Sequence, residues 1–213
     1  MRVLGIESSS LVASVALVTD DILTAEYTVD FKKTHSQTLL PMLDEIVKLL
    51  ELDMDTIDAI AVAGGPGSFT GLRIGAATAK GLGLALKKPL VHVPTVDAMA
   101  YNMWGAEGLI CPIMDAKRSQ VYTGLYHTGN GLEVVMEQQP MDMRELAGLL
   151  NKKGERVIFL GDGVPVYKDI IREMLTVPYA FAPAQMNRQR AASVAALGMN
   201  ALLDAKGCPG ARV

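Results

Sequence analysis

The sequence predicts an α/β protein made of two similar halves, each with the element order β-β-β-α-β-α. Short apolar or alternating runs predict the strands, and longer runs with apolar residues every three or four positions predict the helices. The same order returns after residue 105. The chain has 213 residues, half of them apolar, so it is long enough to bury one large core or two smaller ones.

The first half, residues 1–105, begins with three expected strands over 3–7, 12–18 and 22–29, joined by polar turns as in a meander. A helix is expected over 36–50, because Leu39, Leu43 and Ile46 recur at helical spacing. A strand over 57–63 then leads through a glycine turn, which contains Gly65 and Gly67, into a second helix over 71–86.

Small residues recur every four positions along this second helix, at Gly71, Gly75, Ala79 and Gly83. They form one stripe, which lets another backbone approach closely and recovers the roughly 1 kcal/mol that each helical glycine costs. We expect the stripe to be a groove for a partner, on a surface shared with Leu39, Leu43 and Ile46. A bulky residue in place of Gly75 would then block association and leave the fold intact.

Two cations, Arg73 and Lys80, interrupt the apolar run of the same helix. They are seven residues apart, about two helical turns, and therefore share a face. Their charges argue against a helix that dimerises in a membrane. If they pair with acidic residues of a partner, both belong to the partner-binding surface; the alternative is that both are simply solvated.

The second half, residues 106–213, repeats the plan in reduced form. Strands are expected over 109–115, 120–127, 132–138 and 156–160, and helices over 141–150 and 164–175, with the glycine turn 161–163 between the last strand and helix. In both halves the first strand ends in an acid, Glu7 and Asp115, followed by a polar turn. This duplication resembles the plan of the actin-like ATPase and sugar-kinase superfamily (ASKHA, ribonuclease-H-like). The resemblance implies hairpins that hold phosphates.

These loops are therefore candidates for the remnant of a phosphate site. Its candidate residues are Glu7, Ser8, Ser9, Gly65, Gly67 and Asp115. No lysine follows a glycine at P-loop spacing, and the glycines do not match a dinucleotide fingerprint. The three histidines, His35, His92 and His127, are scattered, and the serine turn has no base beside it. We expect neither a metal, nor a cofactor, nor a catalytic residue.

Charge and cysteine content indicate which ligands and which cellular compartment to expect. The net charge is −3 and no basic stripe is present, so direct tRNA or DNA binding is not expected. Cys111 and Cys208 are typical of reduced thiols. Residues 1–17 lack the basic n-region of a signal peptide, and Glu7 and the serine turn 8–10 interrupt their apolar run. We therefore expect neither a signal peptide nor a membrane span, and we expect a cytoplasmic protein.

Six segments carry a family resemblance: 67–75, which reads Gly-Ser-Phe-Thr-Gly-Leu-Arg-Ile-Gly, and 79–82, together with 5–9, 35–41, 115–118 and 161–163. They resemble the TsaB (YeaZ) family of bacterial tRNA threonylcarbamoyladenosine biosynthesis proteins, which are glycoprotease-like, and the resemblance spans nearly the whole chain. It implies a non-catalytic scaffold that binds and stimulates the threonylcarbamoyltransferase TsaD, with the ATPase TsaE as a third component and a homodimer when alone.

Two other functions remain open at this point. An active small-molecule phosphotransferase would use Glu7 or Asp115 to position Mg²⁺, and its ATP turnover would distinguish it from a scaffold. A peptidase is suggested only by the glycoprotease label of the family, since the sequence offers neither a zinc dyad nor a Ser-His arrangement.

Overall fold

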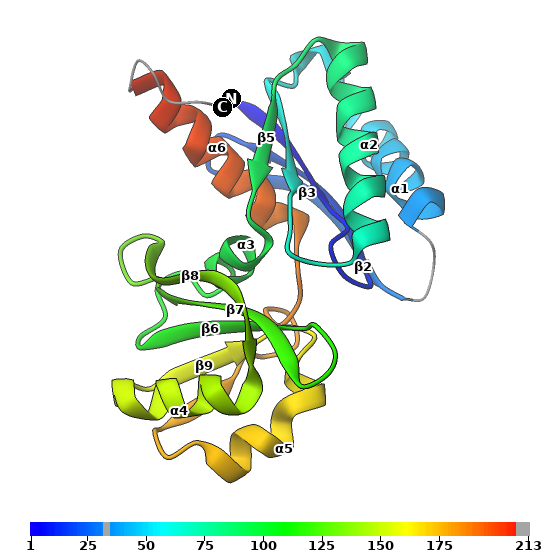
Figure 1. Cartoon of the computed structure of the whole chain (residues 1–213). Helices are drawn as coiled ribbons and strands as arrows, with labels where there is room; N and C mark the ends of the chain where they lie inside the picture. Colours follow the sequence, from blue (N-terminus) through cyan, green and yellow to red (C-terminus); the bar gives the residue numbers. More distant parts are fainter. Residues whose placement is uncertain (32–34, 208–213) are drawn as a thin grey trace. The chain divides into compact units, whose positions relative to one another are not determined.

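The computed structural model describes residues 1–31 and 35–207, which form two units (Figure 1). Unit 1 comprises Met1–Ala98 together with the C-terminal residues from Gln189 onward, and unit 2 comprises Met99–Arg188. This division differs from the predicted boundary after residue 105, because the last helix belongs to unit 1. Cys208 lies outside the described residues.

Unit 1 is built on a five-stranded sheet with the order β3-β2-β1-β4-β5. Its strands are β1 (Arg2–Glu7), β2 (Val12–Thr19), β3 (Ile22–Asp30), β4 (Ala59–Ala63) and β5 (Leu90–Val93). The meander makes β1, β2 and β3 antiparallel to one another, whereas the helical crossovers make β4 and β5 parallel to β1. Strand β3 is thus an edge strand, and among the described strands it pairs only with β2.

Helices cover both faces of this sheet (Figure 1). Helices α1 (His35–Leu50) and α2 (Phe69–Leu86) lie on one face, and α6 (Ala191–Gly207) lies on the other. A 3₁₀ turn, η1 (Met54–Thr56), follows α1, and α3 (Thr95–Tyr101) follows β5. The core on the α1 and α2 face includes Leu4, Ile6 and Ile60, all essentially inaccessible to solvent.

Unit 2 repeats this topology. Its sheet has the order β10-β9-β6-β7-β8, with β7 antiparallel and β9 parallel to β6, as β2 and β4 are to β1. Its elements are β6 (Leu109–Asp115), β7 (Gln120–His127), β8 (Glu133–Asp142), α4 (Met143–Lys153), β9 (Val157–Leu160), α5 (Val164–Met174) and β10 (Tyr179–Phe181). The predicted duplication and its βββαβα order are confirmed, and each sheet gains a fifth strand at its edge.

Helix α6 joins unit 1 because small residues let it lie close to the sheet. A Cβ added to Gly5 would stand 2.2 Å from the carbonyl oxygen of Ala191, and one added to Gly198 would stand 2.5 Å from the Cβ of Ala61. An ion pair between Arg190 and Glu26 of β3 fixes the start of the helix. Local sequence patterns do not predict this return to the first sheet, since the residues of these pairs are far apart in the chain.

Candidate functional site

The serine turn after β1 and the glycine loop before α2 pack directly against each other. Ser8 Oγ donates to the carbonyl oxygen of Gly71 at 2.9 Å, and the backbone N–H of Ser68 donates to the carbonyl oxygen of Ser9 at 2.6 Å. Gly67 must be glycine, because its φ is +157° and a Cβ there would stand 2.3 Å from the same carbonyl oxygen of Ser9. The turn is therefore held by the loop that starts α2.

The candidate phosphate residues of unit 1 lie together within this contact. Glu7, Ser8 and Ser9 have no solvent exposure, and Glu7 Oε1 accepts from the backbone N–H of Ser9 at 2.5 Å. Gly65 exchanges two hydrogen bonds with Thr95, a residue that the sequence reasoning missed. The structure gives these residues a role in packing two loops, and a phosphate-binding role stays a prediction.

The stripe of small residues on α2 faces the sheet of its own unit. Gly71, Gly75, Ala79 and Gly83 are all buried. A Cβ on Gly71 would stand 2.0 Å from the carbonyl oxygen of Ser8, and one on Gly75 would stand 2.2 Å from Ser8 Oγ. The close approach that the spacing predicts is real, but the β1–β2 turn approaches Gly71 and Gly75, and Leu90 approaches Gly83, so the stripe is not an open groove.

The predicted contact residues of α1 are buried too. Leu39, Leu43 and Ile46 are at most 6% exposed and pack in the core between α1 and the sheet. They therefore do not lie on the surface where the sequence reasoning placed them. Helical periodicity identified the apolar face of α1 correctly, yet that face covers the protein's own strands.

The outward face of α2 carries the two predicted cations. Arg73 and Lys80 are exposed and lie on one stripe with Ala77 and Leu84, since these positions are spaced by four, three and four residues. Leu84 is 83% exposed and Phe69, at the start of the helix, is 68% exposed. The Arg73 guanidinium carbon lies 3.8 Å from the centre of the Phe69 ring, a cation–π contact that holds both side chains on the surface.

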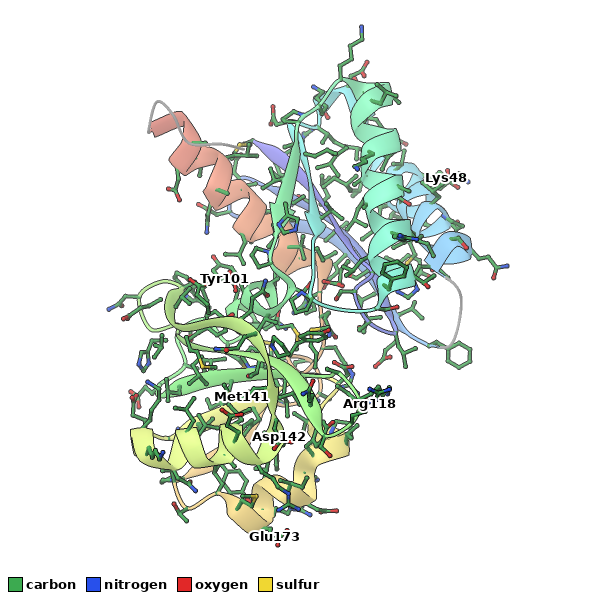
Figure 2. The ribbon with its side chains drawn as sticks, viewed as in Figure 1. Lys48, Tyr101, Arg118, Met141, Asp142 and Glu173 are labelled. Carbon is green, nitrogen blue, oxygen red and sulfur yellow. The ribbon has the colours of Figure 1, made fainter. Side chains whose placement is uncertain are left out.

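The neighbouring helix α1 adds an exposed apolar side chain and a surface ion pair. Leu40 is 53% exposed, and Asp44, one turn later, accepts from Lys48 Nζ at 2.5 Å. Lys48 extends from the exposed side of α1 (Figure 2). We call the outward residues Leu40, Asp44, Phe69, Arg73, Lys80 and Leu84 the α1–α2 face. It combines large exposed apolar side chains with charges of both signs, which is typical of a protein-binding surface.

In unit 2 the candidate Asp115 belongs to the β6–β7 hairpin. Its carboxylate accepts from the backbone N–H of Lys117 at 2.9 Å, from Lys117 Nζ at 2.5 Å and from Tyr167 Oη at 3.0 Å. Residues 117–119 all have positive φ, between 53° and 66°, which is costly for non-glycine residues. Arg118 lies at this turn (Figure 2). The hydrogen bonds to Asp115 therefore stabilise a turn with strained backbone angles.

These contacts shift two pKa values. Burial alone would raise the pKa of Asp115, but the hydrogen bonds from Lys117 and Tyr167 outweigh burial and hold it below its ordinary value. Burial, followed by the hydrogen bond to the Asp115 carboxylate, raises the pKa of Tyr167 to about 12. An ionised carboxylate and a neutral phenol are the forms that the hairpin favours.

Tyr167→Phe should therefore lower the free energy of unfolding by about 1 kcal/mol at neutral pH. The difference from the original protein should shrink as the pH falls through the lowered pKa of Asp115, because protonation removes the acceptor. It should shrink again as the pH rises from about 10 toward 12, because only the original protein then loses the stability that a raised tyrosine pKa provides. Urea unfolding at several pH values measures both limbs.

Tyr179→Phe is the matched control, since Tyr179 packs against Phe159 and Phe181 at the edge of the same sheet. It should leave the pH dependence unchanged. A pH-independent loss in Tyr167→Phe would mean that Asp115 is not the partner that matters.

The described histidines and cysteine were considered as metal ligands or reactive groups. His35 is buried, and His127 Nε2 lies 3.5 Å from Glu155 Oε2. Burial raises the pKa of the Cys111 thiol to about 12. Across residues 1–31 and 35–207, no three His, Cys, Asp or Glu side chains are grouped as metal ligands would be.

Among the helices that the structure describes, none is long and apolar enough to span a membrane.

Two units with one strand order, each with an acid-ended first strand and a glycine turn before its second crossover helix, define an α/β protein of the ASKHA type. The family described as "TsaD: tRNA N6-adenosine threonylcarbamoyltransferase" matches residues 29–207. The tRNA threonylcarbamoyladenosine biosynthesis protein TsaB of Bacillus subtilis is 35% identical over 199 residues, which cover 93% of this chain and 87% of that protein. The chain belongs to the TsaB (YeaZ) family.

Two further comparisons agree. TsaB of Escherichia coli is 32% identical over 160 residues, covering 70% of this chain and 68% of that protein. The structure of YeaZ from Pseudomonas aeruginosa superposes with a TM-score of 0.76 at 24% identity, covering 97% of this chain and 93% of that chain. At this identity the superposition supports the fold, and family membership rests on the sequence matches.

Proposed function

We propose that this chain is a scaffold subunit in the biosynthesis of threonylcarbamoyladenosine in tRNA. In this proposal it performs no catalysis itself, and it binds and stimulates a TsaD-type threonylcarbamoyltransferase. A TsaE-type ATPase is the third component. Family membership supports the pathway, and the α1–α2 face is the observation that supports the scaffold role.

The character of that face supports a protein partner. Phe69 and Leu84 would lose their water on association, and Arg73 and Lys80 would select a partner with acidic residues opposite them. The family match over residues 29–207 indicates that a TsaD-type partner shares this fold. Such a partner can offer an equivalent pair of helices, and a second copy of this chain can offer the same surface when TsaD is absent.

Two features favour a role without chemistry of its own. Glu7 and Asp115, the acids that a phosphotransferase would use for Mg²⁺, accept hydrogen bonds from their own turns. The net charge of −3 gives no support to direct tRNA binding, so we propose that the effect on tRNA is indirect. Steady ATP turnover by the pure protein, lost in Glu7→Ala or Asp115→Ala, would instead establish the phosphotransferase.

Co-purification with TsaD from the same cell tests the scaffold role. Leu84→Asp places a charge at the most exposed apolar position of α2 and should reduce recovery of TsaD about tenfold or more. Val166→Asp, at an exposed position of unit 2, is the matched control and should not reduce recovery.

Threonylcarbamoyladenosine in tRNA should fall when the chain is depleted, and it should return with Val166→Asp but not with Leu84→Asp. Full recovery of TsaD and of the modified nucleoside with Leu84→Asp would contradict the proposed surface.

A further inference from the structure

A groove separates the edge strand β3 from α1 within unit 1. It has a volume of about 530 Å³, within the range of binding pockets. Its lining comes from both elements: Tyr27, Val29, Phe31, Gln37, Thr38, Pro41, Met42 and Glu45. It does not include the cations of α2, so it is distinct from the α1–α2 face through which we propose that TsaD binds.

The strand side of the groove has the periodicity of a strand. Tyr27 and Val29 pair with Val15 and Ala13 of β2 and point toward α1, as Phe31 does two residues later. The alternate residue Glu26 points to the opposite face, where it binds Arg190. Phe31 is 65% exposed and Tyr27 is 43% exposed. A row of apolar side chains thus follows the outer edge of β3, beside which the described residues place no further strand.

The helix side supplies hydrogen-bond acceptors. Pro41 has no N–H, so it cannot donate the α-helical hydrogen bond to the carbonyl oxygen of Gln37, four residues earlier. Both residues line the groove, as does the exposed carboxylate side chain of Glu45. The groove therefore complements an apolar segment with a basic side chain.

We propose that this groove binds an extended segment of a partner protein, which adds to β3 as a sixth strand of the sheet. Its backbone pairs with the open edge of β3. Alternate apolar side chains enter between Tyr27, Val29 and Phe31, and a basic side chain on the same face lies near Glu45. Backbone pairing supplies affinity in such strand addition, and the alternate side chains supply specificity. This binding is independent of the proposed scaffold function.

A fluorescent peptide, Ser-Val-Thr-Leu-Ser-Arg-Thr, tests the proposal by anisotropy with the full chain. It places Val, Leu and Arg on one face of a strand. We expect saturable binding, weakened at least tenfold by Glu45→Lys and unaffected by Asp44→Lys, the adjacent position outside the groove. A peptide with Glu in place of Arg should bind at least tenfold more weakly, and one with Pro in place of the central Leu should fail to pair.

Amide hydrogen exchange in β3 gives a second readout, because strand addition should slow exchange there when the peptide is present. No binding at about 1 mM peptide, equal losses in Glu45→Lys and Asp44→Lys, or unchanged exchange in β3 would each overturn the proposal. Sedimentation that shows weaker self-association in Glu45→Lys, without peptide binding to the original chain, would assign the groove to a second copy of the chain and overturn it as well.

Discussion

Replacing Gly71 with alanine is expected to destabilise unit 1 by about 3 kcal/mol or more, because the new methyl group has no space. Its carbon would stand 2.0 Å from the carbonyl oxygen of Ser8, and a backbone oxygen in a buried turn cannot move aside cheaply. Ser8 Oγ also hydrogen-bonds to the carbonyl oxygen of Gly71, so any shift of α2 breaks that bond. Urea unfolding followed by circular dichroism measures the loss.

Gly81→Ala is the matched control in the same helix. Gly81 is exposed, and an added Cβ would meet nothing within 4 Å. Alanine there should stabilise the protein by about 1 kcal/mol through helix propensity alone. Equal changes in stability in the two variants would contradict the packing of α2 on the serine turn. They would instead support the prediction that the stripe faces outward and binds a partner.

This pair of glycines shows what the sequence could predict and what it could not. Spacing alone predicted that Gly71 and Gly75 form a stripe for close backbone approach, and the structure confirms the approach. Spacing carries no information about which backbone approaches. The β1–β2 turn that fills the stripe is more than 60 residues away in the chain. Periodicity located the buried face of α1 in the same way, but not what it packs against.

The duplication was predictable because it is local and repeated. Each half carries its own meander, helix, strand and glycine turn, and the two sheets have matching strand orders. The place of α6 was not predictable, because its contacts join Gly198 to Ala61 and Arg190 to Glu26 across most of the chain. Of the proposed partner residues, Arg73 and Lys80 remain on the surface, where their charge suggested they would lie.

Glu26 contributes more to stability than its position on an edge strand suggests. Its carboxylate accepts from Arg190 Nε at 3.1 Å and from the backbone N–H of Ala192 at 3.2 Å, and it also pairs with Arg190 Nη2. The Glu26 side chain is only 11% exposed. One carboxylate therefore satisfies both a largely buried guanidinium and the first turn of α6, where a negative charge also complements the helix dipole.

Glu26→Ala should consequently lower the free energy of unfolding by about 3 kcal/mol, because removing one member of a buried pair leaves the other charge without compensation. Hydrogen exchange should accelerate first in α6, whose start loses its anchor. Asp44→Ala removes a carboxylate from an ion pair with Lys48 in which both side chains are more than half exposed, so it should change stability little. Equal stability in the two variants, or unchanged exchange in α6 of Glu26→Ala, would show that the small residues beneath α6 hold it to the sheet without the ion pair.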